Sequence, residues 1–223
     1  GATPSLDRSC STVIDKVDCS ICHADQVSQH NTSTHGQLLA KGDPDAPDCD
    51  SCHGTHNIMR NNDIDSPTYV SNIATLCGEC HGSGEVVDSR REGGMTGMVE
   101  NYEESVHGRA MQESGLIVSA TCTHCHTAHM VLPQENLESS IHRANIVDTC
   151  SNCHKGIFET FKKSIHFTGQ ETENAVLPMC DDCHTSHEIS RTEDAGFKLE
   201  VVESCGHCHE EVMDTYFETF HGK

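Results

Sequence analysis

The chain has 223 residues, of which 35% are apolar and 4% aromatic, with no Trp and a formal net charge of −21. Typical globular domains contain roughly 45–50% apolar residues when glycine is counted, so we expect disulfides, metals or large cofactors to supply part of the core. The charge excludes nucleic acid and anionic lipid as partners, because both bind basic surfaces. No run of 18 apolar residues occurs, so the sequence predicts no membrane span.

Seven copies of one motif follow one another along the chain. Each is a C-x-x-C pair with His directly after it, and together they use 14 of the 15 cysteines. This is the attachment signature of c-type haem, in which both thiols bind the macrocycle and the adjacent imidazole is the proximal iron ligand. Zinc sites, disulfide scaffolds and thioredoxin-like motifs do not require a histidine at all seven places. We therefore predict seven covalently attached haem c groups (Fe). The motifs, numbered as sites 1 to 7, are Cys19/Cys22/His23, Cys49/Cys52/His53, Cys77/Cys80/His81, Cys122/Cys125/His126, Cys150/Cys153/His154, Cys180/Cys183/His184 and Cys205/Cys208/His209.

The seven sites are of two kinds that alternate along the chain. Sites 2, 4 and 6 carry a second histidine three residues after the first, and we call them short sites. Sites 1, 3, 5 and 7 are long sites, in which a later histidine follows in a Ser/Thr-rich segment, after 12 residues or, at site 3, after 26. The second histidines of the short sites are His56, His129 and His187, and the later histidines of the long sites are His35, His107, His166 and His221.

This order predicts one domain, 1–223, with about three and a half repeats at approximately 11–60, 61–135, 136–192 and 193–223. Apolar residues at helical spacing predict helices over 155–166 and 210–221, and Asp, Pro and Gly predict a loop over 41–48. With about one haem per 32 residues, neighbouring haems must nearly touch. The expected fold is a multihaem cytochrome c, mostly coil with short α-helices and little or no β-sheet, organised around a closely stacked haem chain.

The histidine count allows imidazole on both faces of every iron. Seven haems need seven distal ligands, and the second and later histidines together number seven. His30, His124, His142 and His207 remain. His124 and His207 lie inside C-x-x-C gaps, where a ligand role is strained. His142, in E-S-S-I-H, is the main rival, because its segment is similar to those of the later histidines.

Chain geometry predicts which irons these ligands cannot reach. Three extended residues span at most about 10–11 Å, which is too short to pass round a macrocycle. The second histidine of a short site should therefore bind a different haem from that of its own site. Twelve helical residues rise about 18 Å, so a later histidine should reach a neighbour, naturally the short-site haem that follows.

Such an exchange between consecutive sites does not balance, because four later histidines face three short-site haems. His221 is then surplus. It folds back, or His142 or His30 takes a ligand position, or it crosses to another copy. The last option is a head-to-tail contact, which gives a ring or an open filament.

The C-x-x-C-H motifs, the C-H-x-x-H variants and the S-x-H-G segments cover about residues 19 to 221. They resemble those of multihaem c-type cytochromes of metal-respiring microbes, in particular the secreted members that polymerise into extracellular cytochrome nanowires. The resemblance implies bis-histidine, low-spin haems in alternating parallel and perpendicular pairs. It also implies head-to-tail self-association.

The function predicted from these features is electron transfer along stacked bis-histidine haems, as a subunit of an extracellular wire for respiration to external acceptors. A monomeric periplasmic or cell-surface electron shuttle is the alternative, and a reductase of nitrogen or sulfur oxyanions is a further one. We expect no enzyme activity, because filled axial positions leave no place for substrate and no C-x-x-C-K motif occurs.

The expected partners are other redox proteins or extracellular electron acceptors. Haem attachment of this type happens outside the cytoplasm, so we expect a secreted protein that is extracellular, at the cell surface or periplasmic. Cys10 is the odd thiol, either free or paired between chains.

Overall fold

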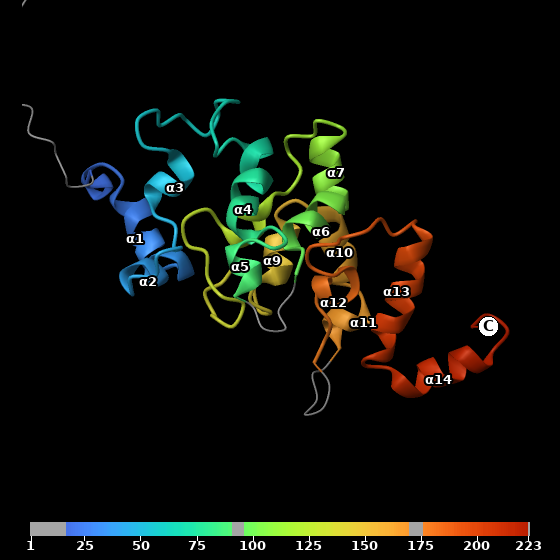
Figure 1. Cartoon of the computed structure of the whole chain (residues 1–223). Coiled ribbons are helices and arrows are strands. Elements are labelled where there is room, and N and C mark those ends of the chain that lie inside the picture. The colour runs from blue at the N-terminus through green and yellow to red at the C-terminus, as the bar shows by residue number, and fades with distance from the viewer. Residues whose placement is uncertain (1–16, 91–95, 170–175, 223) are drawn as a thin grey trace, which may run out of the picture.

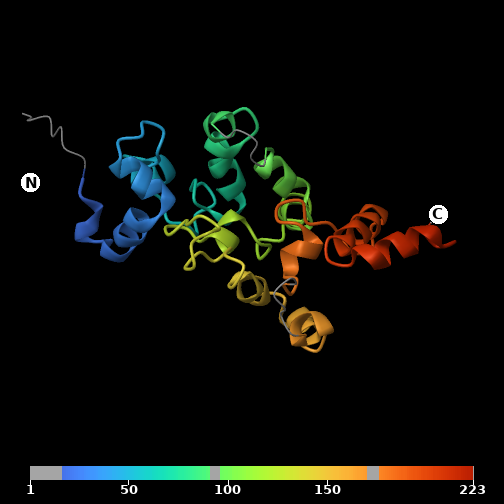
Figure 2. The same ribbon diagram turned by 90° about the horizontal axis from the view of Figure 1, so that it is seen from below.

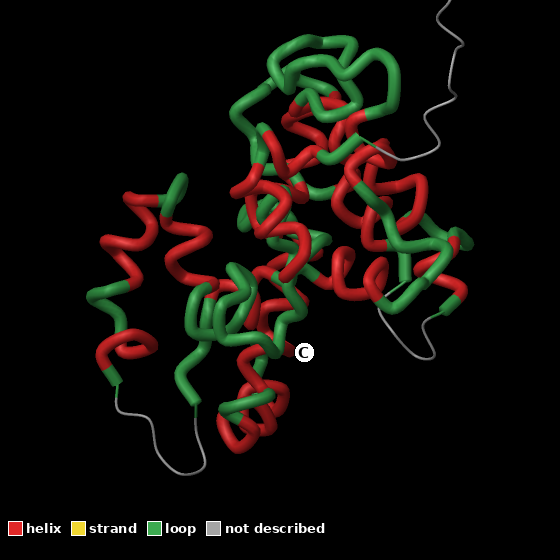
Figure 3. Tube along the Cα trace, turned by 90° about the vertical axis from the view of Figure 1, so that its left-hand side faces the viewer, coloured by secondary structure: helices red, strands yellow, loops and turns green. Residues whose placement is uncertain are grey.

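All regular structure in the described residues is helical. The structure is a computed structural model that describes residues 17–90, 96–169 and 176–222. These residues form short helices joined by long loops and contain no strand (Figure 3), as expected from the sequence. The helices are η1 Cys19–Ile21, α1 Ala24–Thr32, α2 Thr34–Ala40, α3 Cys49–His53, η2 Val70–Asn72, α4 Ile73–His81, α5 Val86–Ser89, α6 Met98–Glu104, α7 Val106–Gln112, α8 Cys122–His126, α9 Ile146–Ser151, α10 Lys155–Phe161, α11 Ile165–Thr168, α12 Cys180–His184, α13 Ala195–Gly206 and α14 Glu210–Glu218.

The helices follow one another from one end of an elongated molecule to the other. Figures 1 and 2 both show α1 and α2 at one end and α13 and α14 at the opposite end. Many helices pack on the next one in the chain, as α1 does on α2, α6 on α7 and α13 on α14. The two ends of the described chain therefore present different faces, one made of η1 and α1 and the other of α14.

The polypeptide has almost no side-chain core. The apolar residues that are buried are Ile73, Ala74, Met111 and Leu132. The chain exposes 16356 Å², whereas a compact protein of 24.4 kDa exposes about 10,000 Å². Hydrophobic burial of side chains is thus too small to hold so many helices together, and the composition had pointed to the same shortage.

One turn occurs twice and marks an internal repeat. Buried Ser66 and buried Ser139 each begin it, and an asparagine six residues later, Asn72 or Asn145, donates to the serine carbonyl at 2.9 Å. A helix follows directly in both cases, α4 after Asn72 and α9 after the other asparagine. The turn therefore leads the chain into site 3 and site 5 in the same way.

Two backbone hydrogen bonds join segments that are far apart in the sequence. The amide of Thr34 donates to the carbonyl of Val131 at 2.9 Å, and the amide of Val106 donates to the carbonyl of Ile189 at 2.8 Å. Each bond links the residue before a later histidine to the chain that leaves a short site. The first links sites 1 and 4, and the second links sites 3 and 6.

The helices predicted over 155–166 and 210–221 are shorter in the structure. α10 ends at Phe161, and α14 ends at Glu218. Ser164 and Thr219 then take extended backbone angles, with ψ of 159° and 166°. A hydroxyl residue offers a side-chain oxygen to the backbone and so competes with continued helix. The later histidine consequently starts a new direction instead of ending a straight helix.

Candidate haem-binding sites

Each short site is a helix of five residues that holds the complete C-x-x-C-H motif. These helices are α3, α8 and α12. In each, the third residue of the motif folds its side chain back onto the backbone amide before the first cysteine, which caps an otherwise unpaired donor. The acceptors and donors are Ser51 Oγ with Asp48 N at 3.2 Å, His124 Nδ1 with Thr121 N at 3.1 Å, and Asp182 Oδ2 with Met179 N at 2.6 Å.

The residue after each short-site proximal histidine turns the chain sharply. Gly54, Thr127 and Thr185 have φ of 76°, 64° and 61°. Few non-glycine residues adopt this region, and the two threonines are the non-glycine residues with positive φ in the part of the chain that the structure describes. The turn sends the second histidine away from its own site, as the reach of three residues predicts.

The proximal histidine of a long site opens the following helix. His23, His154 and His209 are the residues before α1, α10 and α14, and their ψ angles lie between 44° and 49°. Each of these helices then ends shortly before the later histidine. Site 3 differs, because its motif lies wholly within α4 and two more helices precede its later histidine.

The later histidines of sites 1 and 3 share the same local backbone structure. Ser33 and Ser105 are extended, and the hydroxyl of each accepts the amide of the glycine three residues on, Gly36 at 3.1 Å and Gly108 at 3.2 Å. A Cβ on Gly36 would lie 2.0 Å from the carbonyl oxygen of His30, so only glycine fits there. The glycine of S-x-H-G is therefore a structural residue. The sequence pattern shows this glycine but does not show why it is needed.

Ten of the predicted iron ligands lie in five pairs of imidazole rings. The ring-centroid distances fall between 5.9 and 6.3 Å. Two imidazoles bound to one iron have centroids about 6.3 Å apart, from metal–N bonds of about 2.0 Å and ring radii of about 1.15 Å. The residues present therefore fit bis-histidine ligation. The pairs are His35 with His81, His53 with His129, His107 with His154, His126 with His187, and His166 with His209.

Every pair joins two sites of the same kind that are two places apart. Each later histidine pairs with the proximal histidine two sites further along the chain, from site 1 to 3, 3 to 5 and 5 to 7. Each of these second histidines pairs with the proximal histidine two sites earlier in the chain, from site 4 to 2 and from 6 to 4. The expected exchange between consecutive sites is wrong, because the break before each later histidine directs it past the next short site.

Burial lowers the pKa of several of these imidazoles. It is the main cause that lowers the pKa of His35, His107, His126 and His129 below the ordinary value, and neighbouring histidines lower it further. A neutral imidazole has the free lone pair that a metal ligand needs. A lowered pKa therefore favours the neutral form that ligation requires.

Cysteines of consecutive sites are neighbours among the described residues. A thiol hydrogen bond joins Cys19 to Cys49, Cys77 to Cys122 and Cys150 to Cys180, and the last of these is the main cause that lowers the pKa of Cys180 to about 7. At the other consecutive sites, burial is the main cause that raises the pKa of one cysteine, and the charge of a thiol of the neighbouring site raises it further. The neighbouring pairs are Cys19 and Cys49, Cys52 and Cys80, Cys77 and Cys122, Cys125 and Cys153, Cys150 and Cys180, and Cys183 and Cys205. The seven motifs therefore form one unbroken line.

Cys22 and Cys208 differ from the other twelve predicted attachment cysteines. Each motif inside the line has one cysteine beside the preceding site and the other beside the following site. Neither Cys22 of site 1 nor Cys208 of site 7 lies beside a cysteine of another site among the described residues, and both are exposed, as are Cys153 and Cys205. The sequence predicts one role for all fourteen. Haem attachment at both thiols stays a prediction.

The remaining histidines have other roles. His30 Nε2 contacts the carbonyl of Pro47 at 3.1 Å, and His142 Nδ1 accepts the amide of Ala144 at 3.1 Å. In His142 the proton then sits on Nε2, which removes the lone pair a ligand would use. His142 also lies in the turn that begins at Ser139 and not in a segment like those of the later histidines. His124 is the cap of α8, and His207 is exposed.

Four predicted ligands have no imidazole partner among the ring contacts of the described residues. Two are proximal, His23 of site 1 and His184 of site 6, and two are distal, His56 and His221. His56 Nδ1 lies 3.0 Å from the hydroxyl of Thr55, and the ring of His184 lies against that of Phe197 at 5.2 Å. Sequence reasoning missed Phe197, which carries no motif signal.

Cys10 lies outside the described residues. No helix in the described part of the chain is long and apolar enough to cross a membrane. Comparison of the chain with protein-family models, with curated proteins and with solved structures finds no match.

Proposed function

We propose that this protein is a heptahaem c-type cytochrome that transfers electrons and acts as the subunit of an extracellular polymer for respiration to external acceptors. The observation that carries the proposal is the set of five imidazole pairs, which link sites 1, 3, 5 and 7 and sites 2, 4 and 6. Each bound haem would supply one one-electron redox centre. The pairs would hold these centres in succession, so the polypeptide would lay out a path and not a set of isolated sites.

The histidine pairs favour conduction over catalysis. Two imidazoles at one iron occupy both axial positions, so no position remains for a substrate. A reductase of nitrogen or sulfur oxyanions needs an open position. Only the sites of His23 and His184 have no paired imidazole among the described residues, so these two sites are where that alternative must be tested.

The surface supports a partner that is not nucleic acid. The net charge of −21 complements basic patches on redox proteins, and such steering raises the rate of encounter. Cytochrome c maturation outside the cytoplasm requires export, so we propose that the protein is secreted. A monomeric shuttle in the periplasm or at the cell surface is the second candidate, and it differs only in having no self-association.

The test is spectroscopic and uses the full chain expressed with a cytochrome c maturation system. The expected results are a mass that corresponds to seven haems per chain, a pyridine haemochrome spectrum typical of haem c, and electron paramagnetic resonance dominated by low-spin signals. Fewer haems on the intact chain, or a majority of high-spin iron with nitrite or sulfite turnover, would contradict the proposal.

A further inference from the structure

We infer that the chain sorts its haems into two electronic classes by the angle that it sets between the two imidazole rings at one iron. The rings are nearly parallel at sites 2 and 4 and strongly tilted at sites 3, 5 and 7. Two buried serines, Ser33 and Ser105, are the positioning residues for the tilt at sites 3 and 5. The inference rests on the proposed haem binding and deepens it, since it assigns the haems on which an added electron rests first.

The ring angles of the five imidazole pairs fall into two groups that follow the kind of site. At the short sites, the planes of His53 and His129 differ by 15°, and those of His126 and His187 differ by 5°. At the long sites 3, 5 and 7 the angles are 58°, 54° and 41°. The centroid distances are similar in all five pairs, so the angle is the property that differs. This angle between two rings of one site is separate from the angle between neighbouring haems.

The ring angle matters because an imidazole donates π electrons into the iron d orbital whose lobes lie perpendicular to its plane. Two parallel rings act on the same d orbital, which separates two d levels of ferric iron and stabilises the ferric state. Two rings at a large angle act on both orbitals, so the two levels stay close in energy. Axial ligation and the residues that orient the ligands are levers by which a protein sets a reduction potential. An added electron therefore rests first at the tilted pairs.

Burial of the ligands does not separate the two groups. It lowers the pKa of His35 and His107, which are ligands at long sites, and also that of His126 and His129, which are ligands at short sites. Ligands of both kinds of site are thus partly shielded from water. The ring angle is the difference that follows the alternation of sites.

The tilt follows the turn at the later histidine and not the setting of the proximal histidine. His81 ends α4, whereas His154 directly precedes α10, yet the pairs of these two histidines have nearly the same angle, 58° and 54°. Their partners share one local structure. His35 and His107 are each the second residue of a helix that begins after an extended serine. The local structure around the later histidine therefore sets the tilt.

A buried serine hydroxyl holds each of these two turns. Ser33 is 0% exposed and Ser105 is 2% exposed. Each hydroxyl accepts the amide of the glycine three residues later. Each also donates to the carbonyl three residues earlier, that of His30 or Tyr102, at 2.6 Å. The hydroxyl thus ties the helix that carries the histidine to the helix before it, which fixes the direction of the imidazole.

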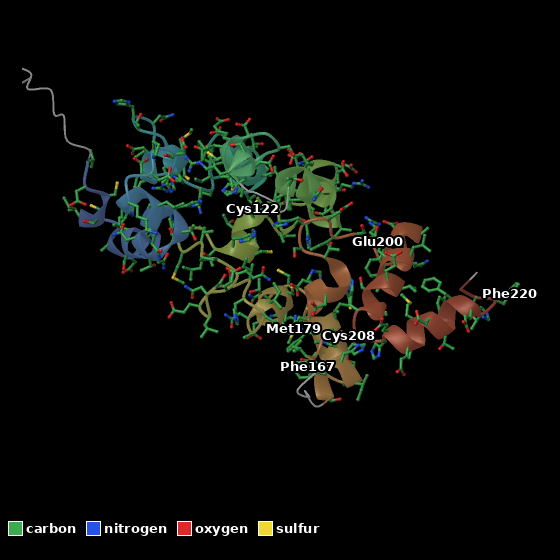
Figure 4. All side chains as sticks on the ribbon, turned by 60° about the horizontal axis from the view of Figure 1, so that its bottom comes forward. Cys122, Phe167, Met179, Glu200, Cys208 and Phe220 are labelled. Atoms are coloured by element: carbon green, nitrogen blue, oxygen red, sulfur yellow. The ribbon has the colours of Figure 1, made fainter. Side chains whose placement is uncertain are left out.

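The third tilted pair shows what happens where this tie is missing. Ser164 holds the same place before His166, but Phe167, near the lower edge of the molecule in Figure 4, stands where the other two segments have glycine. The hydroxyl of Ser164 makes no cap hydrogen bond, and its oxygen is buried without a hydrogen-bond partner among the described residues. The angle of this pair is 41°, the smallest of the three. The larger tilt thus accompanies the bonded hydroxyl.

The alternation of the two classes has a consequence for charge along the molecule. Sites 3, 5 and 7 have tilted pairs, and site 4 between the first two has a parallel pair. Electrons added to a partly reduced chain rest at long sites, with an oxidised short site between them. The separation lowers the repulsion between added electrons, because the Coulomb energy falls with distance. Short sites act as steps between the long ones.

The first experiment replaces Ser105 in the full haem-loaded chain. Ser105→Ala removes both hydroxyl bonds, so one highly anisotropic low-spin signal in electron paramagnetic resonance is expected to shift to lower anisotropy with all seven haems present. Ser105→Thr keeps a hydroxyl and is expected to restore the wild-type signal. Threonine is suitable because Thr219, in the same place before His221, donates to the carbonyl of Tyr216 at 2.7 Å. Ser33→Ala is the second variant, with the same shift expected at site 3.

The matched control for the serine variants is Ser139→Ala. Ser139 is 2% exposed, like Ser105, and its hydroxyl donates to the carbonyl of Leu132 at 3.2 Å. This serine precedes no predicted iron ligand in a turn of the S-x-H kind. Its replacement removes an equally buried hydroxyl, and the low-spin signals are expected to stay unchanged.

The second experiment assigns the classes to individual sites. His129→Ala is expected to remove one rhombic low-spin signal, from site 2, and His107→Ala one highly anisotropic signal, from site 5. Each variant gains one high-spin haem of seven. Difference spectra against the wild type isolate these sites from sites 1 and 6. In a reductive titration of the wild type, the highly anisotropic signals of sites 3, 5 and 7 are expected to disappear before the rhombic ones.

Three outcomes overturn the inference. Loss of the same kind of signal in both ligand variants means that ring angle does not separate the sites. Simultaneous or reversed loss of the two kinds of signal on reduction means that the angle does not decide where an added electron rests. A wild-type spectrum for Ser105→Ala, or an equal shift for Ser139→Ala, means that the serine is structural only. Loss of the haem bands altogether is a different failure, since it contradicts the proposed haem binding and not the two classes.

Discussion

A glycine directly after the histidine constrains three of the four later histidines. Gly36 and Gly108 lie in the first turn of a new helix, Gly222 follows the end of α14, and each would place a Cβ within 2.3 Å of a carbonyl oxygen of the preceding helix. Real Cβ atoms do not approach so closely. The histidine just before the glycine is therefore aimed by backbone packing and not by its own rotamer alone.

Gly108→Ala tests this role. The added Cβ would lie 2.1 Å from the carbonyl oxygen of Tyr102, so α7 must shift and His107 with it. We expect the free energy of unfolding to fall by about 2–4 kcal/mol and one haem of seven, at site 5, to become high-spin. Urea titration and electron paramagnetic resonance measure the two effects.

The matched control is Gly156→Ala in α10, where a Cβ meets nothing within 4 Å. Alanine favours helix over glycine by about 1 kcal/mol, so this variant should be more stable and fully low-spin. Equal behaviour of the two variants would contradict the steric account.

Thr127→Gly tests the positive backbone angle before His129. Thr127 has φ 64° and ψ 169°, a region that glycine occupies without strain, as Gly54 does in the first short site. Relief of strain of order 1–3 kcal/mol, less the entropy lost by glycine of roughly 0.5–1 kcal/mol, predicts a net gain of about 1 kcal/mol by chemical denaturation. Thr185→Gly should gain less, because it also loses the hydrogen bond from its hydroxyl to the carbonyl of Glu188 at 3.0 Å. Destabilisation of the first variant would show that its threonine is retained for a contact.

Short capped helices are the elements that hold the haem motifs. The five-residue helices α3, α8 and α12 are too short to be stable alone, and each gains a cap from the third residue of its motif, which is Ser, His or Asp. All three side chains are long enough to bring an acceptor atom to the backbone amide before the first cysteine. This explains why a histidine stands inside the C-x-x-C of site 4 without being a ligand.

His124→Ala and His124→Asn separate the capping role from ligation. Alanine removes the acceptor for the amide of Thr121, and we expect a loss of about 1 kcal/mol in unfolding free energy. Asparagine keeps an acceptor and should recover most of it. Seven haems and an unchanged low-spin spectrum are expected for both. A new high-spin signal in either variant would make His124 a ligand after all.

The motifs and the absence of sheet could be predicted from sequence, whereas the partners of the histidines could not. The C-x-x-C-H spacing is local, and the reach of three residues already separated His187 from the iron of His184; the structure places it beside His126. The pairing of the later histidines depends on the helix breaks at Ser164 and Thr219, where the apolar spacing predicted an unbroken helix. A change of three to five residues in where a helix ends redirects the histidine past a whole site, and apolar periodicity does not indicate such a change.

At the scale of the whole molecule, the line of sites takes the place of a hydrophobic core. Long-range order comes from five imidazole pairs, from cysteines of consecutive sites and from two backbone bonds between distant segments. Each of these links runs along the molecule, since none spans more than three sites. The structure is thus close to one-dimensional, like a repeat protein in which each unit contacts near neighbours only.

The charge at the two ends of the described chain predicts how the proposed association of copies responds to salt. Asp18 and Asp25 are exposed beside His23 at one end, and Glu210, Glu211, Asp214 and Glu218 are exposed on α14 at the other. The two faces repel each other at low ionic strength, and the Debye length falls from about 30 Å at 0.01 M to about 8 Å at 0.15 M salt. Association should therefore strengthen several-fold on adding salt, as measured by sedimentation velocity of the wild-type chain.

Glu211→Gln/Asp214→Asn is the variant that isolates this effect, because both side chains lie on α14 while His221 and Phe220 are kept. It should associate more strongly at low salt and show a weaker salt response, with the low-spin spectrum unchanged. Salt that weakens the wild-type assembly would mean that oppositely charged groups, and not apolar surface, hold the copies together.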